Sequence, residues 1–133
     1  MKTIMTEKMN KQLLKAQQAE VDAVLMYKGL SEVVNIESMK EVFLQLAKDE
    51  GKHAAIIKKL TGEVLMPKET KKNLVKLIYK VFGLKSVLKL ISNGEFSAAE
   101  NYVSLVVHFS EIEEIRLDEI RHGEIIKKCV THL

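Results

Sequence analysis

A chain of 133 residues fits one domain and is long enough to bury a core, so we expect residues 1–133 to form a single domain. Nearly half of the residues (47%) are apolar, but only six are Gly and one is Pro, which favours a helical bundle over a turn-rich sheet protein. The formal net charge of +3 is small and comes from interspersed acids and bases, so nothing in the charge calls for nucleic acid as a partner.

Apolar periodicity predicts two helices in the first half of the chain. The first covers about residues 6–34, where apolar side chains recur at helical spacing. Ser38 and Glu41 have the spacing of a capping box, which predicts the start of a second helix. That helix is expected to run from Ser38 to about Thr61, because Gly62 is a suitable C-terminal stop.

The second half of the chain begins with a loop, EVLMPKE, that contains the only proline. Thr70 is expected to cap a short amphipathic helix that ends at Gly83, and a third long helix covers roughly residues 85–107. Ser110 and Glu113 repeat the capping-box spacing, and a fourth long helix continues from there almost to the C-terminus. We therefore predict an all-α four-helix bundle of two antiparallel hairpins, joined by a long crossover that contains a short helix.

One glutamate on each long helix has mostly apolar neighbours at helical spacing. A buried carboxylate without a compensating positive charge costs several kcal/mol, and a group of them would also repel one another. The only lysine or arginine on these apolar stripes is Arg116, so side chains alone do not balance the acids, whereas metal ions do. The four residues are Glu20, Glu50, Glu95 and Glu119.

Two histidines complete the predicted ligand set. His53 follows Glu50 by three residues and His122 follows Glu119 by three, which places each pair on one helix face. One Glu from each of two helices and one Glu-x-x-His from each of the other two is the ligand pattern of di-iron and di-manganese carboxylate proteins. Mixed oxygen and imidazole donors suit two Fe ions or Mn, and Zn or Co can substitute.

The two halves of the chain also repeat one another. AEVDAVLMY and GEFSAAENY share Glu, then Ala three residues later and Tyr seven residues later. DEGKHAAIIKK and DEIRHGEIIKK share the Asp-Glu pair, a base, the His, two Ile and two Lys. Two hairpins related by a pseudo-twofold axis would bring the four glutamates together, and the duplication argues against a chance occurrence of the motif.

Four further residues have two interpretations each. Asp49 directly precedes Glu50, and Asp118 directly precedes Glu119. These aspartates are either ordinary surface acids or acceptors for the far N–H of a ligating histidine on the opposite helix, and we favour the second role. Tyr27 lies two turns after Glu20, and Tyr102 lies two turns after Glu95. They are either core residues or donors of a hydrogen bond to a ligand carboxylate.

The crossover, residues 68–91, carries seven lysines and one acid. Its apolar side chains either cover the bundle or a second subunit, or form an element that docks to a membrane surface or a partner. The sequence does not distinguish these interpretations. No apolar run is long enough to span a bilayer, and MKTIMTEKMNKQLLKAQQ lacks the apolar core of a signal peptide. With a single cysteine, Cys129, these features lead us to expect a cytoplasmic protein.

From about residue 6 to 133, the chain resembles the rubrerythrin-like branch of the ferritin-like superfamily. The resemblance rests on AEVDAVLMY, DEGKH, GEFSAAENY and DEIRH. The stretch VFGLKSVLKLISNGE also resembles the ferritin-like domain fused to membrane iron transporters of the vacuolar type. The resemblance implies that Glu50 and Glu119 bridge two irons, that Glu20 and Glu95 are terminal ligands, and that His53 and His122 bind one iron each.

The same resemblance implies an activity, because members of this branch oxidise ferrous iron, reduce peroxide or handle dioxygen, often as homodimers. Two departures matter. Full rubrerythrins carry a four-cysteine rubredoxin centre, and they tend to have an extra glutamate where this chain has Ala98. We therefore expect a ferroxidase-like or peroxidase-like oxidoreductase that takes electrons from a separate donor. The alternatives are an iron-handling module without turnover that docks to a membrane or transporter, and a purely structural bundle.

Overall fold

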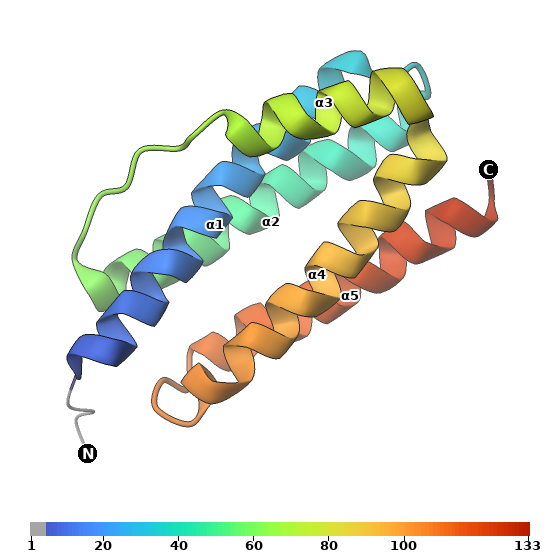
Figure 1. The fold of residues 1–133 in the computed structure, drawn as a ribbon. Helices are drawn as coiled ribbons and strands as arrows, with labels where there is room; N and C mark the ends of the chain where they lie inside the picture. The colour runs from blue at the N-terminus through green and yellow to red at the C-terminus, as the bar shows by residue number, and fades with distance from the viewer. Residues whose placement is uncertain (1–4) are drawn as a thin grey trace. The chain divides into compact units, whose positions relative to one another are not determined.

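The computed structural model describes residues 5–133, and five α-helices account for most of them (Figure 1). No residue between 5 and 133 lies in a β-strand. The described chain forms two compact units, residues 5–77 and residues 78–133. The helices are α1 (Glu7–Val33), α2 (Glu37–Thr61), α3 (Thr70–Phe82), α4 (Leu84–Val106) and α5 (Ile112–Thr131).

The first unit contains the antiparallel hairpin of α1 and α2, which pack along each other (Figure 1). Thr6 caps α1, since its hydroxyl oxygen accepts a hydrogen bond from the Met9 N–H at 3.1 Å. The stacked rings of Tyr27 and Phe43, with centroids 6.1 Å apart, lie in the buried interface between the two helices. The predicted helical hairpin is therefore present in this half.

The predicted capping box at the start of α2 is wrong. The helix begins at Glu37, one residue before Ser38, and its N-cap is Ile36, which offers no side-chain hydrogen bond. The backbone at Ile36 is extended, and its carbonyl accepts the N–H groups of Met39 and Lys40. Ser38 consequently lies inside the first turn, where its hydroxyl cannot act as the cap.

A hydrogen-bonded strap ties the end of α2 and the following loop to α1. The buried Gln17 side chain donates to the Glu63 carbonyl oxygen at 2.8 Å and accepts from the Thr61 hydroxyl at 2.6 Å. Further along the loop, the Lys68 N–H donates to the Asp22 carboxylate at 2.7 Å. These three bonds join residues more than forty positions apart and fix the loop along α1.

The Lys72 side chain of α3 lies against Gly29 of α1, where the absence of a Cβ atom leaves room for it. A Cβ atom added to Gly29 would lie only 2.6 Å from Cγ of Lys72. Thr70 is the first residue of α3 rather than its cap, and the Asn73 N–H instead donates to the Glu69 carbonyl oxygen. The predicted end at Gly83 is accurate, because α3 stops at Phe82 and Gly83 has φ 88°, which favours glycine.

The second unit contains the hairpin of α4 and α5. The buried Ser92 hydroxyl donates to the Gly123 carbonyl oxygen at 3.0 Å and so links the two helices. A Cβ atom added to Gly123 would lie 2.8 Å from the Phe96 ring, so the glycine makes room for this ring. The side chains of this hairpin that are least exposed include Val87, Leu88, Ile112, Ile115 and Ile126.

The second predicted capping box is also wrong. Helix α5 begins at Ile112, and the Ile112 and Glu113 N–H groups donate to the backbone carbonyls of Phe109 and Ser110. The Glu113 carboxylate accepts hydrogen bonds from Arg116 at 2.8 and 2.6 Å. This hydrogen bonding to Arg116 lowers the pKa of Glu113 below its ordinary value of 4.5.

Within residues 5–133, no helix combines the length and apolar character that crossing a membrane requires.

Candidate metal centre

The four predicted glutamates are all buried. Glutamate is seldom fully buried in folded proteins unless it is paired. Only 2–6% of the surface of each is exposed. By contrast, Glu32, Glu41 and Glu114 lie on the same helices and are exposed, as the polarity of their neighbours predicts. Helical spacing thus separated the buried acids from the solvated acids in this chain. The buried set is Glu20, Glu50, Glu95 and Glu119.

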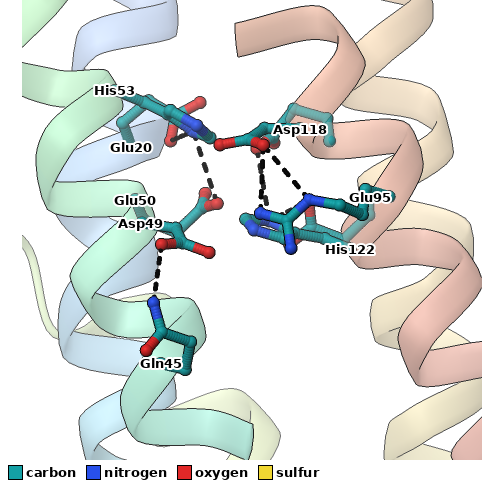
Figure 2. Close-up of polar contacts among 10 residues, drawn as sticks. Glu20, Gln45, Asp49, Glu50, His53, Glu95, Asp118 and His122 are labelled. Carbon is teal, nitrogen blue, oxygen red and sulfur yellow. Dashed lines mark hydrogen bonds and ion pairs between the residues drawn. The ribbon is translucent and has the colours of Figure 1, made fainter. Parts of the chain in front are cut away.

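The first unit brings three of the predicted ligands together (Figure 2). Nδ1 of His53 lies 3.4 Å from Oε2 of Glu20 and 3.6 Å from Oε1 of Glu50. One ligand atom from each of the three residues lies within 4.8 Å of the other two. We call Glu20, Glu50 and His53 the first triad. Helix α1 supplies its first member, and one face of α2 supplies the other two.

The second unit brings the other three together in the same way. Nδ1 of His122 lies 3.6 Å from Oε2 of Glu95 and 3.6 Å from Oε1 of Glu119. Their ligand atoms also lie within 4.8 Å of one another. We call Glu95, Glu119 and His122 the second triad. Helix α4 supplies its first member, and α5 supplies the Glu-x-x-His pair.

Each triad has the donor chemistry of a metal site. The converging carboxylate and Nδ1 atoms are buried, and each Nδ1 lies 3.4–3.6 Å from two carboxylate oxygens. Two ionised carboxylates and a neutral imidazole balance one divalent cation, which removes the cost of burying two like charges. The buried carboxylate and histidine residues are therefore compatible with a di-metal site of the carboxylate type.

Apolar side chains surround each triad along its helices and exclude water. In α1, Leu13 lies two turns before Glu20 and Tyr27 two turns after it, and neither has measurable exposed surface. In α5, Ile112 and Ile126 have the same relation to Glu119. A dry environment strengthens the attraction between a carboxylate and a cation, because the local dielectric constant is low.

Asp49 and Asp118 have different partners from each other. Asp49 is buried and accepts a hydrogen bond from the Gln45 side chain at 2.9 Å (Figure 2). Asp118 is partly exposed and pairs with Arg121 at 3.0 Å. A carboxylate oxygen of Asp118 also lies within 4.8 Å of a His122 ring nitrogen. Their role as acceptors for ligating histidines stays a prediction.

Tyr27 and Tyr102 are both buried, as the core interpretation requires. Tyr27 stacks on Phe43 in the first hairpin. A hydrogen bond from either hydroxyl to a ligand carboxylate stays a prediction. Arg116, the one base on the predicted apolar stripes, directs its guanidinium to Glu113.

Two polar residues that our prediction did not include lie one helical turn before the first member of each triad. Gln17 precedes Glu20 and Ser92 precedes Glu95, and both are buried with hydrogen bonds to the neighbouring helix or its loop. The available signal was a polar residue on an otherwise apolar stripe. By fixing α1 on α2 and α4 on α5, these residues set the positions of Glu20 and Glu95 within their hairpins.

In a comparison with protein-family models, the Rubrerythrin model matches residues 11–130. The match spans both hairpins and all six triad residues, and it confirms the resemblance and the all-α, ferritin-like fold class. No curated protein and no solved structure matches the chain. The match covers most of the chain, and the chain therefore belongs to the rubrerythrin family.

Proposed function

We propose that the two triads combine into one centre for two metal ions and that the native metal is iron. The single observation that carries this proposal is that each hairpin buries the same donor set at corresponding helical positions. A pair of Glu-x-x-His helices with two further glutamates is the ligand set of di-iron carboxylate proteins. In this proposal Glu50 and Glu119 would be shared by the two ions, Glu20 and Glu95 would each hold one ion, and His53 and His122 would each bind one ion.

Charge and coordination number support a centre for two ions. Four ionised carboxylates balance two divalent cations, so the buried centre is neutral when the imidazoles are neutral. Six protein residues do not complete the coordination of two ions that prefer five or six ligands, which leaves positions for a small substrate. Carboxylate and imidazole donors suit Fe and Mn, and Zn or Co can occupy the same ligands in a purified protein.

The proposed reaction is the oxidation of the bound ferrous ions by peroxide or dioxygen. Two ferrous ions supply two electrons, which together with two protons reduce one hydrogen peroxide to two waters. The carboxylates of Glu50 and Glu119 would hold the ions in place during this change of charge. The apolar walls around Glu20 and Glu119 exclude bulk water, and Asp49 and Asp118 would hold the ligating imidazoles in one tautomer.

Reduction of the centre after each turnover requires electrons from another molecule. The chain has one cysteine, so these 133 residues do not hold a four-cysteine iron centre. Ala98 occupies the position where the family resemblance implies a further glutamate, so this chain offers no additional carboxylate there. We therefore propose a separate electron donor, and a homodimer as the assembly that the resemblance implies.

The test is a single-turnover measurement on protein loaded anaerobically with about two ferrous ions per chain. The loaded protein is mixed with hydrogen peroxide or with air-saturated buffer, and the remaining ferrous iron is trapped at intervals with a coloured chelator. We expect oxidation faster than in protein-free buffer, with about two irons oxidised per peroxide. Glu50→Gln and Glu119→Gln should abolish the acceleration, whereas Glu32→Gln, an exposed control on α1, should preserve it.

The same experiment separates turnover from iron handling. If ferrous iron binds to the triads but oxidises no faster than in buffer, the redox proposal fails and the non-enzymatic iron-binding alternative stands. If iron does not bind, both fail.

A further inference from the structure

The outer face of α3 carries apolar side chains that are exposed to solvent. Leu74, Leu77 and Val81 are 53%, 58% and 61% exposed. They recur at i, i+3 and i+7, so they lie on one side of the helix. We call these three residues the outer stripe. Phe82, at the end of α3, is also exposed.

The opposite side of α3 holds the less exposed residues of the helix. Val75 is buried, and the Lys72 and Lys76 stems lie against Gly29 of α1. The outer stripe is therefore turned away from α1 rather than towards it. This arrangement removes the simplest structural role for the stripe, which is to cover the adjacent hairpin.

Basic side chains border the outer stripe. Between residues 68 and 89 the sequence has seven lysines and one acid, Glu69. Lys71 and Lys80 are exposed and lie about 90° from the stripe, one on either side, when residues are placed at 100° intervals around the helix. Their long stems allow the ammonium groups to stay in a polar layer while the stripe enters an apolar one.

We propose that α3 lies in the plane of an anionic lipid surface, with the outer stripe in the acyl boundary and the bordering lysines among the head groups. An apolar face flanked by lysines matches the two layers of such a surface. A second copy of the chain fits less well, because two stripes that meet face to face would bring two sets of lysines together.

The proposal is independent of the metal centre, so it is tested on the full chain by flotation with vesicles. One set is neutral phosphatidylcholine, and the other contains about one third phosphatidylserine, an anionic lipid. We expect binding to the anionic vesicles only, and weaker binding as the salt concentration rises. Lys71→Gln with Lys80→Gln should weaken binding about 25-fold, at about fivefold for each lysine.

Matched variants separate the stripe from general effects of apolarity and charge. Leu77→Ser with Val81→Ser should abolish flotation, and both positions are exposed, so the fold should persist by circular dichroism. Val64→Ser with Met66→Ser changes two exposed apolar residues in the loop before α3 and should leave flotation unchanged. Lys52→Gln with Lys59→Gln removes two exposed charges from α2 and is the matching charge control, so it should also leave flotation unchanged.

Three results would overturn the proposal. Flotation that is absent, or equal with neutral and anionic vesicles, contradicts an anionic lipid surface. Unchanged flotation of the stripe variant contradicts the role of α3. A dimer in light scattering that the stripe variant alone loses would assign the stripe to a second copy of the chain instead.

Discussion

Replacing Gln17 with Ala should destabilise the protein strongly for one substitution on a helix. The Gln17 amide nitrogen donates to Glu63 at 2.8 Å, and its oxygen accepts from Thr61 at 2.6 Å. Losing two hydrogen bonds costs about 2 kcal/mol, and the buried space left by the shortened side chain adds about 1 kcal/mol. The free energy of unfolding should therefore fall by about 3 kcal/mol, which lowers the melting temperature by roughly 10 °C in a chain of this size.

The assay is urea and thermal unfolding of metal-free protein, followed by circular dichroism. Thr61→Val removes the hydroxyl and should cost about 1 kcal/mol, because the second bond of this hydroxyl, from the Glu63 N–H at 3.2 Å, is exposed and water can replace it. Because the two side chains share one bond, the double variant should be less destabilised than the sum of the single variants, by about 1 kcal/mol. Lys15→Ala, exposed on the same helix, is the control and should change stability little. Two results would refute the stabilising role of these hydrogen bonds. One is additive effects of Gln17→Ala and Thr61→Val, and the other is a fall in the free energy of unfolding of less than about 0.5 kcal/mol for Gln17→Ala.

Three further predictions concern other parts of the chain. Gly94→Ala should stabilise α4 by about 0.5–1 kcal/mol, because an added Cβ atom would have no neighbour within 4 Å. Gly123→Ala should stabilise the protein less or destabilise it, because its Cβ atom would lie 2.8 Å from the Phe96 ring. Chemical denaturation compares the free energies of unfolding of the two variants. Hydrogen bonding to Arg116 lowers the pKa of Glu113 below 4.5, so the pair should stabilise the fold at neutral pH and lose this effect as the pH falls below 4.5. Arg116→Met should return the Glu113 pKa towards 4.5 in a carboxyl NMR titration, and an unchanged pKa would contradict the pairing. Burial raises the pKa of the Cys129 thiol above 9.0, so alkylation by iodoacetamide should be slow at pH 7, and its rate should still be rising with pH at 9.0.

The arrangement of helices could be predicted from the sequence because it depends on periodicity. Each long helix has an apolar stripe that must be buried, and the stripe specifies both the helix and its inward face. The buried acids stood out for the same reason, since Glu20 and Glu119 interrupt stripes that are otherwise apolar. The Glu-x-x-His spacing then placed each histidine beside its glutamate, as the 3.6 Å distances in both hairpins show.

The helix caps could not be predicted reliably, because a capping box is a local pattern with competitors. Glu113 satisfies the spacing, but Arg116 lies one turn later and offers a charged hydrogen bond instead. At the start of α2, Ile36 has an extended backbone and is the N-cap, so Ser38 already lies inside the helix and does not cap it. Both capping-box predictions were wrong because the competing groups, Ile36 and Arg116, lie outside the four residues of the pattern.

Contacts between distant segments were the other feature that the sequence did not reveal. The strap depends on residues 44 and 46 positions apart, and no periodicity links Gln17 to Thr61 or Glu63. The internal repeat also suggested two equivalent halves. In the structure, Gln17 binds a loop carbonyl, whereas its counterpart Ser92 binds a helix carbonyl on α5. The repeat thus preserved the ligands but not the hydrogen bonds that support them.

The most direct test of the metal centre is the metal content of the protein after purification from iron-replete cells, measured by inductively coupled plasma mass spectrometry. The combined triads predict about two ions per chain, mainly iron, and a clear loss in both Glu50→Gln and Glu119→Gln. Glu32→Gln should retain the full content. Trace metal in the parent protein, or an unchanged content in both triad variants, would contradict the account.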